Sequence, residues 1–192
     1  MPYYIIMTSR LTFISGGAWS GKTARAESIA QSYEQVVWIG TALTTLPELA
    51  VSTKLLQTAR PSHWIHVDAG FNLPETFEKI QREYKTSTIV VDSISQWLCN
   101  EFAKGTSRFD EQQLASSLER DVQEVCMMAK RASLTQPVII VSSDFGQSLP
   151  PQDHLQRILR HTVGKTNQDF AQAATHVEIL FAGIVIHQKK SK

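Results

Sequence analysis

The stretch of sequence that decides the fold is Gly16-Gly17-Ala18-Trp19-Ser20-Gly21-Lys22-Thr23. It matches the pattern G-x-x-x-x-G-K-[ST], in which glycines let the backbone turn so that its N–H groups surround phosphate oxygens. The lysine of this pattern, Lys22, reaches the β- and γ-phosphates, and the hydroxyl after it, on Thr23, is a ligand for Mg²⁺. The stretch therefore predicts a loop that binds a nucleoside triphosphate together with Mg²⁺.

The residues on both sides of the loop predict a strand and a helix. Leu11–Ser15 is a short apolar run that leads into two glycines, and Lys22–Tyr33 has Ala and Ile at helical spacing. Further buried strands are predicted at Val36–Gly40, Thr88–Asp92, Val138–Ser142 and Val177–Ala182. Helical patterns lie between them, at Leu73–Tyr84, Asp110–Ala132 and His154–Ala174.

Strands that alternate with helices in this way are typical of one fold class. They predict a doubly wound α/β fold with a mainly parallel sheet, similar to P-loop NTPases. Leu43–Ala59 fits no single pattern, because it is partly helical in spacing but contains Pro47 and several β-branched residues.

The strand Thr88–Asp92 ends in a carboxylate. At the carboxyl edge of a parallel sheet, such a side chain can face the Mg²⁺ held by the phosphate loop. We therefore expect Thr23 and Asp92 to hold the metal, and Lys22 and Asp92 to be the catalytic residues. The alternative is that Asp92 caps a helix beginning at Ser93.

The composition limits the classes of function. The 192 residues contain 42% hydrophobic and 19% charged residues, and they predict a single domain covering residues 1–192. The formal net charge of +1 supplies no field that would recruit nucleic acid. No apolar run reaches the ~20 residues of a membrane span, and the first residues do not read as a secretory signal. We expect a cytoplasmic protein in which Cys99 and Cys126 are reduced thiols.

Longer motifs carry a more specific resemblance. They are G-G-A-W-S-G-K-T followed by Ala26-Glu27, V-D-S-I-S-Q-W-L-C-N, and a C-terminal pattern of S-D-F-G, Pro151, Arg157, Arg160 and Gly164-Lys165-Thr166-Asn167-Gln168. Together they resemble the cobinamide kinase/cobinamide-phosphate guanylyltransferase family of cobalamin assembly, from Thr12 onward.

The resemblance implies an enzyme with two steps. ATP or GTP phosphorylates the aminopropanol hydroxyl of adenosylcobinamide, and GTP then transfers GMP to the product through a histidine. It also implies that Thr41, Arg60 and Asp68 contact the guanine nucleotide, with Asp68 standing where the family often has Glu. The implied partners are a nucleoside triphosphate and a corrinoid, and the implied assembly is a homotrimer.

The sequence departs from the family pattern in three places. Leu56 occupies the position of the nucleotide-accepting histidine, and leucine cannot form a phosphoramidate. His63 and His66 lie close by in the sequence as alternative acceptors or as ordinary partly buried side chains. Trp19 replaces a usual Arg, and Asp144 replaces a usual Glu.

Three functional readings follow. The first is a kinase of this family with impaired or rerouted guanylyl transfer. The second is a non-catalytic nucleotide-binding paralogue, and the third is a P-loop kinase for another small hydroxyl substrate. Lys22, Thr23 and Asp92 favour an enzyme, whereas Trp19 and Leu56 favour a binding protein.

Overall fold

The computed structural model describes residues 9–43, 54, 55, 57–147 and 149–190. The strands are β1 (Leu11–Gly16), β2 (Val36–Gly40), β3 (Ile65–Asp68), β4 (Thr88–Asp92), β5 (Val138–Ser143), β6 (His176–Phe181) and β7 (Ile184–Lys190). The helices are α1 (Lys22–Ala30), α3 (Leu73–Glu83), α4 (Ile94–Gly105), α5 (Glu111–Ala132) and α6 (His154–Ala173).

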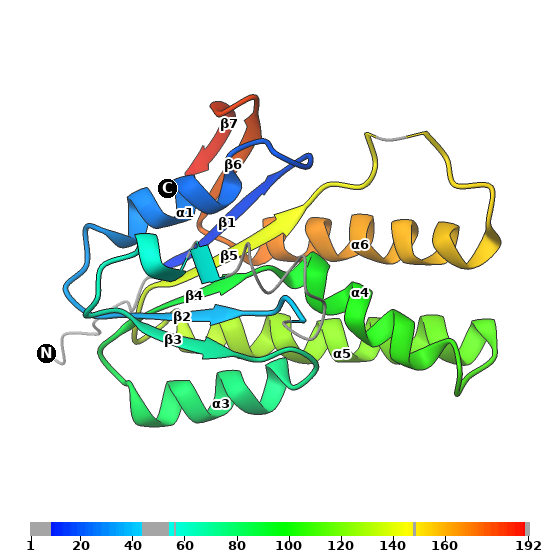
Figure 1. Ribbon diagram of the computed structural model, residues 1–192, viewed down its shortest axis with the longest axis horizontal. Coiled ribbons are helices and arrows are strands. Elements are labelled where there is room, and N and C mark those ends of the chain that lie inside the picture. The colour runs from blue at the N-terminus through cyan, green and yellow to red at the C-terminus, as the bar shows by residue number, and fades with distance from the viewer. Residues whose placement is uncertain (1–8, 44–53, 56, 148, 191–192) are drawn as a thin grey trace, which may run out of the picture.

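The strands form one seven-stranded sheet in the order β3-β2-β4-β5-β1-β6-β7. Every neighbouring pair is parallel except β6 and β7, which are antiparallel. The predicted α/β fold with a mainly parallel sheet is confirmed. Because β1 lies between β5 and β6, the loop after β1 opens at the carboxyl edge, where the parallel strands end (Figure 1).

Helices cover the two faces of the sheet unequally. The helices α3, α4, α5 and α6 lie on one face and α1 lies on the other (Figure 1). Successive residues of β1 point to opposite faces: Phe13 stacks on Phe170 of α6 at 5.9 Å, whereas Ile14 packs with Ala26 of α1. This alternation explains why the strands are apolar on both sides.

The structure adds two strands that the sequence analysis did not predict. One is the edge strand β3. The other is β7, which forms a hairpin with β6; β6 itself (His176–Phe181) lies where the strand Val177–Ala182 was predicted. Ala182 and Gly183 have positive φ angles of 50° and 81° and turn the chain between the strands. Of the ambiguous segment Leu43–Ala59, residues 54, 55 and 57–59 are helical, and residues 44–53 and 56 lie outside the described residues.

A buried ion pair ties α1 to the sheet. Arg25 donates to both carboxylate oxygens of Glu178, at 2.6 and 2.8 Å, and the Glu178 side chain is 0% exposed. His176 lies 2.9 Å from the same carboxylate. The hydrogen bond from Arg25 is the main reason that the pKa of Glu178 falls to about 2. The pair holds the helix that follows the phosphate loop.

We expect this carboxylate to make stability depend on pH in acid. The pKa of Glu178 is about 2 in the folded protein against an ordinary 4.5, so its stabilising effect is present above pH 4.5 and lost as pH falls through about 2. Since water screens the partly exposed Arg25, the loss should be about 2 kcal/mol. Urea unfolding of the parent and of Glu178→Gln, near pH 5 and near pH 2, should give free energies that converge in acid.

A surface pair supplies the control for this measurement. Lys165 lies 3.0 Å from Glu119, and both side chains are exposed. Glu119→Gln should change the free energy of unfolding by less than about 0.5 kcal/mol at either pH. An equally large effect of Glu178→Gln at both pH values would mean that the charge of Glu178 does not carry the stabilisation.

No helix within the described part of the chain is long and apolar enough to cross a membrane.

Candidate active site at the phosphate loop

The loop between β1 and α1 has a backbone that depends on glycine. A Cβ added at Gly16 would overlap the carbonyl oxygen of Leu180 on the neighbouring strand. Gly21, the N-cap of α1, has a φ of 93°, which residues with a side chain rarely adopt. The loop therefore lies close against the strand that carries Leu180 and turns through Gly21 into the N-terminus of α1, the backbone arrangement that a phosphate site uses.

Lys22 lies across this loop. Its Nζ donates to the carbonyl oxygen of Gly17 at 2.6 Å, and the residue is only 8% exposed. Burial lowers the pKa of Lys22, while the carboxylates of Asp92 and Asp144 act in the opposite direction. The ammonium group is thus positioned within the loop, between the loop backbone and two carboxylates, where an anionic phosphate would meet it.

The predicted metal ligands lie together. The hydroxyl of Thr23, on the first turn of α1, donates to Oδ2 of Asp92 at 3.0 Å. Burial raises the pKa of Asp92, although Thr23, Arg60 and Lys22 counteract this shift. Two oxygen groups side by side at the mouth of the loop fit Mg²⁺, which prefers oxygen ligands and takes the remaining ones from phosphates and water. No group of three or more His, Cys, Asp or Glu side chains with metal-binding geometry occurs among the described residues.

Ser93, and not Asp92, caps the helix after β4. The Ser93 hydroxyl accepts a hydrogen bond from the backbone N–H of Gln96 at 3.2 Å. The capping alternative for Asp92 is therefore wrong, and its carboxylate is free to face Thr23.

Thr41 anchors the backbone that follows β4 through hydrogen bonds to Ser93. Its side chain is completely buried, and its hydroxyl accepts from the backbone N–H of Ser93 at 2.9 Å and donates to the Ser93 carbonyl at 2.8 Å. Asn100 of α4 donates to the Thr41 carbonyl at 2.8 Å. The described structure thus places Thr41 as a support for the turn after Asp92. Asn100 ends the motif V-D-S-I-S-Q-W-L-C-N, but the sequence alone indicated no role for it.

Arg60 lies in a cluster beside α1. Its Nε donates to Glu27 at 2.6 Å, and its guanidinium carbon lies 3.7 Å from the centre of the Trp38 ring. Trp38 stacks on Trp64 at 5.9 Å with an angle of 11° between the rings. Arg60 also lowers the pKa of Asp92, so its charge acts at the candidate metal ligand. Its fixed plane and positive charge suit a nucleotide ligand.

The other residues near Arg60 differ in exposure. Asp68, at the end of β3, is exposed, with Oδ1 3.4 Å from Gln57. His66 is partly buried, and its Nδ1 has no hydrogen-bond partner in the described structure. Burial and then Arg60 lower the pKa of His66, which favours the neutral ring. His63 is exposed. Leu56 lies outside the described residues.

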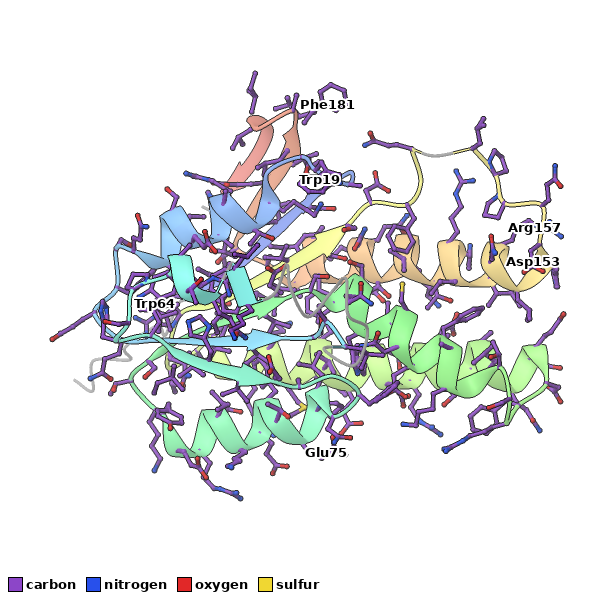
Figure 2. The ribbon with its side chains drawn as sticks, viewed as in Figure 1. Trp19, Trp64, Glu75, Asp153, Arg157 and Phe181 are labelled. Carbon is purple, nitrogen blue, oxygen red and sulfur yellow. The ribbon has the colours of Figure 1, made fainter. Side chains whose placement is uncertain are left out.

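The segment after β5 closes the other side of the phosphate loop. The backbone N–H of Asp144 donates to the Gly16 carbonyl at 2.8 Å, and Asn167 of α6 donates to the Ser143 carbonyl at 3.1 Å. Arg160 donates to the Gly146 carbonyl at 2.6 Å. A groove of about 550 Å³ opens here, lined by Gly146, Pro150, Arg157, Arg160, His161, Gly164, Lys165 and Gln168. Arg157 lies at the far end of α6 from the phosphate loop (Figure 2).

The arrangement of these motifs agrees with a family comparison. The family model described as "Cobinamide kinase / cobinamide phosphate guanyltransferase" matches residues 12–187. The chain belongs to this family. The match runs from β1 to the last strand and therefore includes the phosphate loop, Asp92 and the segment after β5.

Two curated proteins of this cobinamide kinase family are similar to the chain over nearly its whole length. One is the bifunctional adenosylcobalamin biosynthesis protein CobU of Escherichia coli strain K12, with 25% identity over 93% of this chain and 99% of that protein. The other is the protein of the same name from Salmonella typhimurium strain LT2, with 26% identity and the same coverage. The family predicted from the motifs is confirmed.

Solved structures confirm the fold of this family member as that of a P-loop NTPase. The assembled type III secretion ATPase EscN of enteropathogenic E. coli is similar with a TM-score of 0.55 and 9% identity, over 91% of this chain and 43% of that one. A prototypical type III secretion ATPase gives a TM-score of 0.53 and 12% identity, over 90% of this chain and 51% of that one. At such low identity the likeness concerns the fold alone.

Proposed function

We propose that this protein is an adenosylcobinamide kinase that transfers the γ-phosphoryl group of ATP or GTP to the aminopropanol hydroxyl of its corrinoid substrate. One observation carries the proposal. In a chain of the cobinamide kinase family, Lys22, Thr23 and Asp92 converge on the mouth of one phosphate loop, with Thr23 and Asp92 only 3.0 Å apart. This is the set of groups that phosphoryl transfer requires.

Each residue has a defined part in this proposal. The loop 16–23 binds the phosphates through its backbone, from Gly16, Gly17, Ala18, Trp19, Ser20, Gly21, Lys22 and Thr23. Lys22 neutralises charge that develops on the transferred group, and Thr23 and Asp92 would hold Mg²⁺. When bound, Mg²⁺ supplies positive charge to the phosphate oxygens. The substrate hydroxyl oxygen attacks the γ-phosphorus and its proton passes to water, while the bond between the γ-phosphorus and the β,γ-bridging oxygen breaks and ADP or GDP leaves.

The nucleotide's base and sugar have candidate contacts beside α1. Arg60 is held by Glu27 and Trp38, and Asp68 is exposed at the end of the neighbouring strand β3. We propose that these two residues contact the nucleoside, and that Thr41 acts through the turn after Asp92, because its hydroxyl is engaged by Ser93.

A kinase assay tests the proposal. The purified chain is incubated with adenosylcobinamide, Mg²⁺ and either ATP or GTP, and phosphorylated corrinoid is separated by chromatography. Formation of adenosylcobinamide phosphate supports the proposal. Nucleotide binding without product would favour a non-catalytic paralogue, and phosphorylation of another alcohol in place of cobinamide would favour a different small-molecule kinase.

Guanylyl transfer through an enzyme-bound nucleotide is the step that we expect to be absent. Leu56 has neither a lone pair nor an exchangeable proton, so it cannot accept GMP. Incubation with α-labelled GTP and Mg²⁺ should leave no acid-labile, hydroxylamine-sensitive label on the protein. Leu56→His should create such an adduct if the loop and Arg60 hold GTP in reach.

A GMP adduct on another histidine would contradict this expectation. His66 offers an imidazole Nδ1 without a hydrogen-bond partner in the described structure, next to Arg60. A labelled peptide from the parent protein that contains His66 or His63 would show that the acceptor has moved, and the full two-step activity would then be the proposed function.

Three further proposals concern the protein as a whole. We propose a single domain across residues 1–192, a cytoplasmic location and a homotrimer. Sedimentation of the purified chain tests the trimer, and limited proteolysis tests the single domain by asking whether one compact fragment resists cleavage.

A further inference from the structure

Trp19 is exceptional within the phosphate loop. It has a φ of 57°, a conformation that is unfavourable for a bulky residue, and its side chain is fully exposed to solvent. A side chain in this position contributes nothing to the core, yet it occupies a strained site where glycine would fit without cost. Strain and full exposure in a functional loop together indicate a role in binding.

The β6–β7 hairpin extends the apolar surface around Trp19. The backbone N–H of Gly183, in the turn, donates to the carbonyl of Ser20 at 2.9 Å, so the turn lies against the loop. Phe181 and Ile184, which flank this turn and pair across the strands, are 61% and 66% exposed. Figure 2 shows Trp19 and Phe181 at the same edge of the molecule, one on the loop and the other on the hairpin.

We propose that Trp19, Phe181 and Ile184 form an apolar platform on which the macrocycle of the corrinoid acceptor rests during phosphoryl transfer. The inference rests on the proposed kinase function and names where the acceptor binds. Trp19 belongs to the loop that would hold the γ-phosphate, and Phe181 and Ile184 lie on the hairpin beside that loop. A macrocycle seated there keeps the hydroxyl of its side arm within reach of that phosphate.

The chemistry of the surface selects this occupant. A corrinoid is broad, and its rim carries methyl groups and methylene chains beside its amides, so it offers exposed aromatic and aliphatic side chains a larger apolar contact than a small polar alcohol would. A nucleotide would use the loop backbone and the charges of Lys22 and Arg60. The platform offers no cation, and its only hydrogen-bonding side-chain group is the indole N–H of Trp19, so it suits the acceptor and not the phosphates.

Equilibrium dialysis of cobinamide against the full chain, without nucleotide, tests the platform. Trp19→Ala and Phe181→Ala should each weaken cobinamide binding about tenfold. Trp19→Phe keeps an aromatic ring and should bind cobinamide almost as tightly as the parent does. Met127→Ala is the matched control, because Met127 is 63% exposed on α5, on the opposite face of the sheet from α1, and should leave binding unchanged. In the kinase assay, Phe181→Ala should raise the KM for cobinamide and leave ATP affinity unchanged.

The outcomes separate the two proposals. If the parent neither binds nor phosphorylates cobinamide, the proposed function fails and the platform fails with it. If the parent binds cobinamide and both alanine variants bind it equally well, only the platform is wrong. Parallel losses of ATP affinity in Phe181→Ala, or a change in sedimentation coefficient that accounts for the lost binding, would assign the surface to the nucleotide or to a second copy of the chain and overturn the inference.

Discussion

Replacing Lys22 with alanine should reduce the rate of phosphoryl transfer by a factor of about 10²–10³ or more. The ammonium group lies inside the loop at 2.6 Å from the Gly17 carbonyl, close enough to move to a phosphate bound by the same loop. In the proposed kinase its charge would stabilise the transferred group more in the transition state than in the bound substrate, so the main loss should be in kcat. Steady-state kinetics with ATP and with GTP measure it.

The variant should remain folded. Lys22 is 8% exposed and burial lowers its pKa, so the protein environment disfavours the charge, and removing that charge should cost little stability. Lys79→Ala on the exposed side of α3 removes the same charge far from the loop and should keep full activity. A Lys22→Ala protein that turns over ATP as the parent does would disprove the assignment of the loop.

The strand, loop and helix that frame the candidate phosphate site were predictable because their signals are local. The glycines and Lys22 fix a strand, a loop and a helix within a short stretch, and the structure has β1 and α1 at those places. The pairing of Thr23 with Asp92 was also predictable, since the carboxyl ends of β1 and β4 meet at one edge of the sheet.

The missed strands show what local signals leave out. The edge strand β3 has an exposed Ile65 and an exposed Asp68, so its apolar pattern is weak, and only pairing with β2 makes it a strand. The strands β6 and β7 read as one apolar run because Gly183 is the only strong turn residue between them.

The side chains that contact Arg60 could not be predicted from the sequence either. Glu27 comes from α1 and Trp38 from β2, far from Arg60 in the chain, and tertiary packing alone brings them together. The complete burial of Thr41 is a similar case, because its hydrogen bonds reach across to Ser93 at the end of another strand. A resemblance can name such residues, but it does not show how they act.

Asp92→Asn separates a role at the metal from a role in folding. The carboxamide keeps the size of the side chain and can still accept the hydrogen bond from Thr23, which is 3.0 Å long in the parent protein. It removes the negative charge that would offset Mg²⁺. Nucleotide binding in the presence of Mg²⁺ should therefore become about 10–100-fold weaker, while binding in EDTA should change much less.

The pH dependence of the parent gives the same residue a second, independent test. Burial raises the pKa of Asp92 above the ordinary value of 3.8, so the protonated form, which cannot hold Mg²⁺, is favoured at a higher pH than for an exposed aspartate. The Mg²⁺-dependent gain in ATP affinity should shrink as pH falls through that raised pKa, and this dependence should vanish in Asp92→Asn. Asp153→Asn makes the same chemical change at the N-cap of α6, where asparagine also caps, and should alter neither measurement. Equal losses of affinity with Mg²⁺ and with EDTA in Asp92→Asn would assign the carboxylate to the structure of the loop and not to the metal.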